Sequence, residues 1–209
     1  MLALLDCHYP GDVSGRRVIM PYCGVEVSIG RQWNADLYKA LRTAGVNCQR
    51  IDVDTARPQS VKTAMELKAQ GVRRVGANVA IETHCNYHPS IDVRGWAVLI
   101  GRNDDRSRDL GWAVAKAWEP LVREYKVGKR VRIYQVPHND TRYRDPVQFE
   151  ILRREDCSLV LPELGNLEVA KIRHNLIARD RFWFRFVEAT AQAVKEVLGD
   201  EREDTTAGG

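Results

Sequence analysis

Short apolar runs alternate with segments of helical periodicity along the chain, and this alternation restricts the fold more than any other feature. The segments between the apolar runs repeat their apolar residues at near-helical spacing. Such an alternation predicts an α/β domain with a mostly parallel, twisted sheet flanked by helices on both faces. We expect strands at residues 2–7, 48–53, 79–84, 95–101 and 158–163.

Four segments are expected to be helices. The first begins near Ser28 and stops at Gly45, and a shorter one covers about residues 60–69. A third helix, over residues 110–125, should be kinked by Pro120, which lacks an amide hydrogen and clashes with the preceding turn. The closing helix is expected to carry one apolar stripe, formed by Phe184, Val187, Ala191, Val194 and Leu198.

The length of 209 residues suits one domain with a core of its own, and neither a repeat nor a linker divides the chain. Residues 1–198 are predicted to form this domain, and the polar stretch 199–209 a flexible C-terminal tail. The sequence gives no indication of the oligomeric state.

Composition is that of an ordinary soluble protein, with 44% hydrophobic and 29% charged residues. No apolar run approaches the ~20 residues of a membrane span, so membrane insertion is not expected. The apolar N-terminal stretch lacks a basic flank and meets Asp6 early, so we expect no signal peptide and synthesis in the cytoplasm. Five cysteines without a regular spacing should stay reduced there. A formal charge of +4 says little about partners, and nucleic acid is not expected among them.

Three of the expected strands end in a residue suited to metal binding or proton transfer. These residues are His8, His84 and Glu163, and Glu26 lies just before the first helix as a fourth candidate. Ligands of open α/β sheets gather beyond the carboxyl ends of the strands. We therefore expect the four side chains to meet at one edge of the sheet.

Strand geometry sorts the neighbours of the two histidines. Side chains alternate between faces, so His84 shares its face with Glu82, and His8 shares its face with Asp6. Glu82 and Asp6 are candidates for carboxylates that fix the tautomer of a metal-binding histidine, and salt bridges at the strand ends explain them equally well. The cysteine beside each histidine points the other way and is expected to be a small core residue.

Two histidines and one carboxylate form a ligand set of catalytic zinc sites, which keep a fourth position open for water. Zinc would lower the pKa of that water and polarise a substrate carbonyl, while a nearby glutamate moves the proton. The spacing of the candidates matches no short metal motif. On the residues alone, either Glu26 or Glu82 completes the set, and strands that merely end in polar residues remain an alternative to a metal site.

Four segments occur in the order LLDCHYPGD, GVEVSIGRQWNADLYKALRTAGV, NVAIETHCN and LRREDCSLVLPELGNLE. Together they resemble the zinc-dependent N-acetylmuramoyl-L-alanine amidases, cell-wall hydrolases with a Gly-His-Gly segment, a Glu opening the first helix, a Ser-Ile-His-Ala-Asn segment and a late Val-Glu-Leu-Gly-Phe segment. The resemblance covers residues 1–198. It implies that His8, Glu26 and His84 bind one zinc ion (Zn2+), and that Glu163 is the catalytic carboxylate.

The resemblance also implies a substrate and a setting. The substrate is peptidoglycan, cut at the amide between N-acetylmuramic acid and L-alanine. A single catalytic domain with neither an export signal nor a wall-binding module looks like a bacteriophage lysis enzyme, an endolysin that acts on the cell wall. Asn86 and His138 are candidate substrate contacts, the latter in a long polar loop at residues 135–146.

Several positions depart from the family pattern. Glu82 and Thr83 stand where the family has Ser-Ile, Asn166 replaces the Phe, and the glycines around the first histidine are replaced. A carboxylate at position 82 should strengthen cation binding. These departures leave room for a cytoplasmic zinc N-acyl-amino-acid amidohydrolase of the N-formylglutamate type. A non-catalytic wall-binding module that keeps the fold is a further alternative, of another class. The basic stretch 123–132 fits a helix end and an edge strand as well as it fits an anionic partner.

Overall fold

A computed structural model describes residues 1–6, 23–51, 61–86, 90, 92, 95–137 and 147–203 of the chain. Its strands are β1 (Leu2–Leu5), β2 (Cys48–Ile51), β3 (Val79–Glu82), β4 (His84–Asn86), β5 (Trp96–Gly101), β6 (Arg132–Val136) and β7 (Ser158–Asn166). Its helices are α1 (Cys23–Thr43), α2 (Val61–Val75), α3 (Asp105–Glu124), α4 (Val147–Arg153), α5 (Ala170–Ala178) and α6 (Arg181–Glu203).

The strands of the described residues form one sheet of order β2-β1-β3-β7-β5-β6, in which β4 also pairs with β7. The pairs among β1, β2, β3, β4 and β7 are parallel. β5 is antiparallel to β7, and β6 is parallel to β5. The predicted α/β fold with a mostly parallel sheet is therefore confirmed. The carboxyl ends of β1, β4 and β7 share one edge, and those of β5 and β6 lie at the opposite edge.

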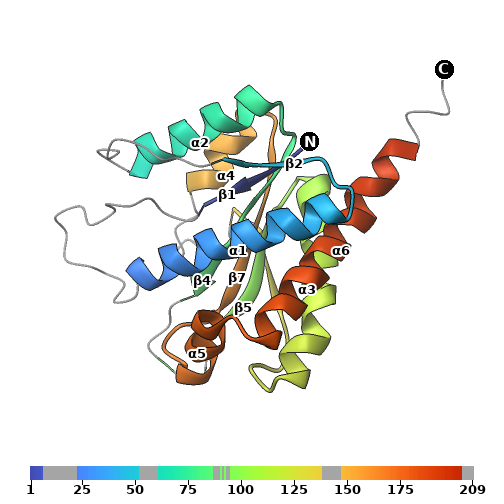
Figure 1. The fold of residues 1–209 in the computed structure, drawn as a ribbon. Coiled ribbons are helices and arrows are strands. Elements are labelled where there is room, and N and C mark those ends of the chain that lie inside the picture. Colours follow the sequence, from blue (N-terminus) through green and yellow to red (C-terminus); the bar gives the residue numbers. More distant parts are fainter. Residues whose placement is uncertain are drawn as a thin grey trace.

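Helices cover both faces of the sheet (Figure 1), and each face has its own core. α1, α3 and α6 pack over one face, where the larger core includes Leu2, Leu4, Val79 and Ile81. α2 and α4 pack over the other face, where the smaller core includes the alternate residues of the same strands. Each central strand is thus apolar on both sides, which explains why the strands are continuous apolar runs in the sequence.

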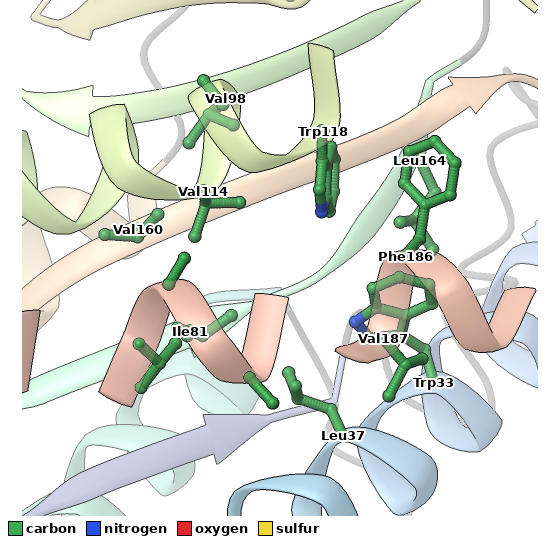
Figure 2. Packing of buried hydrophobic residues seen from close by; sticks show 14 of the residues in the cluster. Trp33, Leu37, Ile81, Val98, Val114, Trp118, Val160, Leu164, Phe186 and Val187 are labelled. Carbon is green, nitrogen blue, oxygen red and sulfur yellow. The ribbon is translucent and has the colours of Figure 1, made fainter. Parts of the chain in front are cut away.

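Aromatic side chains fill the larger core. Trp33, Trp118 and Phe186 lie close together in Figure 2, and the ring centroids of Trp33 and Trp118 are 6.0 Å apart with the planes at 82°. Trp183 packs edge-on against Trp33 with its centroid at 5.1 Å. Trp96 stacks on Phe186 with the centroids 4.8 Å apart. Four of the five tryptophans of the chain are therefore buried in this one core.

β3 and β4 are one strand interrupted at Thr83. Ile81 is paired with Val160 and His84 with Glu163, so the register places Thr83 opposite Pro162. Proline has no amide hydrogen to give to the ladder, which accounts for the break at this point. Pairing resumes at His84, and the expected single strand over residues 79–84 instead ends at Asn86.

Some expected helix boundaries and faces are wrong. α1 begins at Cys23 rather than near Ser28, so Glu26 lies inside the first turn instead of before the helix. Phe184 is 45% exposed, whereas its neighbours Phe182 and Trp183 are buried. Three consecutive residues of a helix point in different directions, so not all of the Phe-Trp-Phe run can face the core. Here Phe184 is the one that faces outward.

Three further helices are longer than expected. α2 continues to Val75, and α3 passes through Pro120 without ending. Pro120 and the residue one turn earlier, Lys116, are both exposed, so the carbonyl that loses its partner can face solvent. α6 runs to Glu203, beyond the Leu198 boundary of the predicted domain. No helix in the described part of the chain is long and apolar enough to cross a membrane.

Candidate active site

His84 and Glu26 meet at the edge of the sheet where β1, β4 and β7 end. His84 opens β4 and is 8% exposed, while Glu26 comes from the first turn of α1 and is 2% exposed. The Nδ1 atom of His84 lies 3.1 Å from Oε1 of Glu26. The same oxygen accepts a hydrogen bond from the backbone amide of Cys85 at 3.0 Å. α1 therefore delivers a carboxylate to the start of β4, where the His84 ring and the Cys85 amide hold it.

The other ring nitrogen of His84 faces a second carboxylate. Oε1 of Glu82 lies 3.1 Å from Nε2 of His84, as expected for side chains two residues apart on one face. The same Oε1 accepts a hydrogen bond at 2.8 Å from Nζ of Lys68, on α2. The Lys68 and Glu82 side chains are 1% and 0% exposed. This buried ion pair lies directly behind His84, and the sequence analysis did not identify Lys68.

A signal for Lys68 exists in the sequence. Ala64, Met65, Ala69 and Val72 are buried on one stripe of α2, and position 68 falls on that stripe. A lysine among apolar residues at helical spacing indicates a buried cation with a partner. The partner itself could not be chosen without the fold.

Glu163 lies on β7 beside His84. The two residues are register partners in a parallel ladder, so their side chains leave the sheet on the same face. Glu163 is half-buried, and its Oε2 atom is shielded from solvent yet makes no hydrogen bond to another described residue. Gly165, at φ +94°, turns the chain directly after it, where an added Cβ would lie 3.0 Å from Trp96. Glu163 therefore retains hydrogen-bonding capacity at Oε2.

The environments of the site separate the pKa values of its groups. Burial opposes the charge on His84, but the carboxylates of Glu26 and Glu82 outweigh it and raise the pKa of His84 to about 10. Burial also opposes the charge on Glu82, but Lys68 and His84 lower its pKa to about 2. For Glu163, burial dominates and, with the charge of Glu26, raises the pKa to about 7 despite the nearby imidazolium. Glu163 is thus the group poised to exchange a proton near neutral pH.

Asp6 belongs to the other face of the sheet. Its Oδ1 atom accepts a hydrogen bond at 2.8 Å from Nδ2 of Asn34, on α1. Arg31 and Arg50 lie within 3.7 and 3.8 Å of its carboxylate. Among the described residues, Asp6 therefore anchors the end of β1 to α1 and β2. Its expected role beside His8 stays a prediction, because His8 lies outside the described residues.

Some of the remaining candidate residues lie near the site, and others do not or lie outside the described residues. Asn86 ends β4, half-buried, opposite Asn166. Asn166 is fully buried and donates to the backbone oxygen of Ser90 at 3.1 Å, so it fixes the chain beyond β4. Cys85 is buried in the larger core, as expected for a small core residue. His138 lies outside the described residues, and His174 is exposed on α5.

Two of the three donors expected for a zinc ion, Glu26 and His84, lie at a separation that suits one. With zinc bonds of about 2.0 to 2.1 Å, adjacent ligands of a tetrahedral site lie about 3.3 Å apart. The 3.1 Å between His84 Nδ1 and Glu26 Oε1 is close to this separation. Within the part of the chain that the structure describes, no three His, Cys, Asp or Glu side chains form a group that could hold a metal. The third expected ligand, His8, is not in that part.

A large cavity lies elsewhere. It has a volume of about 740 Å³ and is lined by the ends of β5 and β6, the start of β7 and the beginning of α3. These elements place it at the edge of the sheet opposite His84 and Glu163. The cavity is therefore separate from the candidate site.

Comparison with protein families gives one match. A family model described as N-acetylmuramoyl-L-alanine amidase matches residues 17–196, which is most of the chain. Glu26, His84 and Glu163 lie within the matched range, and His8 precedes it. A search among curated protein sequences gave no significant match.

Solved structures share the fold over nearly the whole chain. The catalytic domain of CwlV, an N-acetylmuramoyl-L-alanine amidase from Bacillus (Paenibacillus) polymyxa var. colistinus, has a TM-score of 0.69 at 18% identity, covering 95% of this chain and 98% of that one. The amidase AmiC2 of Nostoc punctiforme has a TM-score of 0.66 at 19% identity, covering 95% and 97%. The catalytic domain of the endolysin CD27L, which targets Clostridia difficile, has a TM-score of 0.61 at 13% identity, covering 93% and 95%.

Proposed function

The chain belongs to the N-acetylmuramoyl-L-alanine amidase family, and from that premise we propose that Glu26 and His84 hold a zinc ion while Glu163 moves the proton. The bond hydrolysed is the amide that joins N-acetylmuramic acid to L-alanine in peptidoglycan. One observation carries the assignment of residues. Two metal-competent atoms of Glu26 and His84 face each other at 3.1 Å beside Glu163, whose Oε2 makes no hydrogen bond to another described residue.

Zinc, when bound, supplies a Lewis acid that polarises the amide carbonyl and lowers the pKa of water. The carboxylate of Glu163 removes a proton from the attacking water and holds it at an oxygen atom. As the carbon–nitrogen bond breaks, Glu163 delivers this proton to the leaving nitrogen of L-alanine. The products are the carboxylate of the muramic acid lactyl group and a free amino group. A pKa of about 7 suits Glu163 to both transfers.

Glu26, rather than Glu82, is the carboxylate ligand in this proposal. Glu82 approaches His84 from the Nε2 side and is engaged by Lys68, whereas Glu26 approaches from the Nδ1 side, on the edge of the sheet. His8 is proposed as the third ligand on the resemblance of its segment alone.

Metal analysis tests the ligand assignment. We expect about one zinc per chain in the wild type, and its loss in both Glu26→Ala and His84→Ala. His174→Ala, which removes an exposed histidine on α5, serves as the control and should keep its zinc. Zinc retained at the wild-type level in folded Glu26→Ala and His84→Ala would refute the assignment.

The substrate is tested with purified cell walls. Zinc-loaded protein should release new N-terminal L-alanine from peptidoglycan and leave N-formylglutamate intact. Hydrolysis of N-formylglutamate without wall digestion would favour the cytoplasmic amidohydrolase, and zinc-loaded protein inert on both would favour a wall-binding module.

The setting of a bacteriophage lysis enzyme is also proposed. The similarity to the endolysin CD27L supports it. Bacteria that express the chain should then lyse only when the membrane is permeabilised, which turbidity measurements with and without a permeabilising agent would show. Lysis at the same rate without permeabilisation would contradict this setting.

A further inference from the structure

We propose that Lys68 and Glu82 form a positioning pair for the metal site, in which Lys68 holds Glu82 and Glu82 fixes the tautomer and ring orientation of His84. The proposal rests on the proposed function, because it takes His84 as a metal ligand. It concerns two residues behind the ligand, on α2 and β3, that touch neither substrate nor metal.

Lys68 and His84 both contact the same oxygen atom of Glu82. Nζ of Lys68 donates to Oε1 of Glu82 at 2.8 Å, and the same oxygen lies 3.1 Å from Nε2 of His84. A carboxylate paired with an ammonium group is ionised and can only accept hydrogen bonds. Nε2 of His84 must therefore carry a hydrogen. In a neutral imidazole the lone pair is then on Nδ1, the atom that faces Glu26.

This arrangement is the one a metal-binding histidine needs. Histidine ligands usually donate their second ring nitrogen to a carboxylate, carbonyl or water, and this contact fixes the tautomer and the ring orientation. Glu82 supplies that acceptor from the same face of the strand, two residues before His84. The interruption of the ladder at Thr83 leaves the chain between the two residues without regular pairing, so the side-chain contact with Glu82 restrains His84 where the backbone pairing is broken.

Lys68 explains how the Glu82 carboxylate can remain buried beside a site that already contains the carboxylates of Glu26 and Glu163. Glu82 is fully buried, and its second oxygen makes no hydrogen bond to another described residue. Without a cation, its charge would add to those of Glu26 and Glu163. Lys68 neutralises Glu82 and also engages Oε1, which keeps the carboxylate on the Nε2 side of the ring. Glu82 is thereby prevented from turning toward the metal as a competing ligand.

A structural role alone does not account for the pair. Replacing a buried ion pair by apolar residues of similar volume is often neutral or stabilising. The α2 stripe around Lys68 is otherwise apolar, so Met at position 68 would continue it. A charged pair in contact with His84 therefore points to a role in the site rather than in the core.

The test compares variants that differ in the acceptor offered to Nε2. Lys68→Met/Glu82→Leu removes the ion pair and the acceptor, whereas Lys68→Met/Glu82→Gln removes the ion pair but keeps a side-chain carbonyl that can accept. Lys68→Met alone removes only the group that holds the carboxylate. Thr190→Val removes a remote buried hydrogen bond, from Trp118 at 2.8 Å, and controls for general loss of stability.

Zinc affinity and the His84 side chain are measured for each folded variant, by chelator competition and by 15N NMR of the zinc-loaded protein. We expect zinc affinity to fall by about 10- to 100-fold in the Leu double variant and by less in the Gln double variant. In Lys68→Met we expect a fall of about 10-fold, with faster solvent exchange of the His84 Nε2 hydrogen. Thr190→Val should leave both readouts unchanged.

The outcomes separate this inference from the proposed function. Wild-type zinc affinity and an unchanged Nε2 hydrogen in both double variants would overturn the positioning pair while leaving Glu26 and His84 as ligands. Equal losses in the Leu and Gln double variants would overturn the role of the acceptor. Zinc binding that survives Glu26→Ala and His84→Ala would instead remove the site on which the inference rests. If Lys68→Met does not fold, the two double variants still decide.

Discussion

The two faces of the sheet are buried by different means. Over one face, α1, α3 and α6 enclose a large apolar core with four tryptophans, and Trp183 completes it by donating to Asp36 at 2.9 Å. Over the other face, α2 and α4 enclose a smaller core that contains the Lys68–Glu82 pair and leads to His84 and Glu163. The comparison indicates that the aromatic core is stabilised mainly by apolar packing, whereas the other face buries the ion pair that contacts His84. Glu26 reaches the site from α1, on the aromatic side.

The largest expected effect on stability lies on the aromatic face. Trp183→Ala leaves a cavity and deprives Asp36 of a donor, so we expect a loss of about 3 to 5 kcal/mol in the free energy of unfolding, measured in urea. Trp112, 55% exposed on α3, is the matched control. Trp112→Ala should change stability by less than about 0.5 kcal/mol. A similar loss in both variants would contradict the stabilising role of the buried aromatic core.

A somewhat smaller loss is expected from Lys68→Met. Glu82 is then buried without its cation, which should lower the free energy of unfolding by about 3 kcal/mol. Lys68→Met/Glu82→Leu should regain most of this loss, because neither charge remains. The measurement is urea unfolding of the three metal-free proteins. If Lys68→Met were as stable as the wild type, the Lys68–Glu82 pair would not be as shielded from solvent as the structure shows.

The third expected effect is a gain in stability rather than a loss, and it concerns Glu163. Burial raises the pKa of Glu163 from its ordinary value of 4.5 to about 7. The folded protein then binds more protons than the unfolded chain between these values, so stability falls as pH rises through this window. The destabilising contribution of the ionised Glu163 carboxylate is fully present above about pH 7. It is absent below about pH 4.5, where the carboxyl group is protonated in both states.

Glu163→Gln should therefore stabilise the metal-free protein by about 1 to 3 kcal/mol at pH 8, with little change at pH 4. Urea unfolding at the two pH values, in the presence of a chelator, provides the measurement. A Gln variant that is less stable than the wild type at pH 8 would show that Glu163 makes stabilising contacts and is not held in an unfavourable state.

The same two faces show how far the sequence could be interpreted. Periodicity predicted the core strands and the long helices, because burial on both faces leaves continuous apolar runs. It could not predict the start of α1, since Cys23 and Gly24 give no capping or stripe signal, and Glu26 was therefore placed outside the helix. It also could not decide which aromatic residue of the α6 start faces outward, because all three suit a core.

Part of the site can be predicted from the sequence for a different reason. His84 and Glu163 follow apolar strands, so the edge that they share can be predicted from the parallel sheet. Lys68 could not be paired with Glu82 from the sequence, because their contact depends on how α2 crosses β3. Long-range ion pairs of this kind are set by packing angles rather than by local pattern.

The most direct test of the proposed chemistry is the rate at which zinc-loaded Glu163→Gln releases N-terminal L-alanine from purified peptidoglycan. Glu168→Gln, altered in the turn after β7, is the control. We expect the rate of Glu163→Gln to fall by about 10²- to 10⁴-fold while zinc stays bound, and the control to keep the wild-type rate. A wild-type rate in fully zinc-loaded Glu163→Gln would contradict the assignment of proton transfer to Glu163.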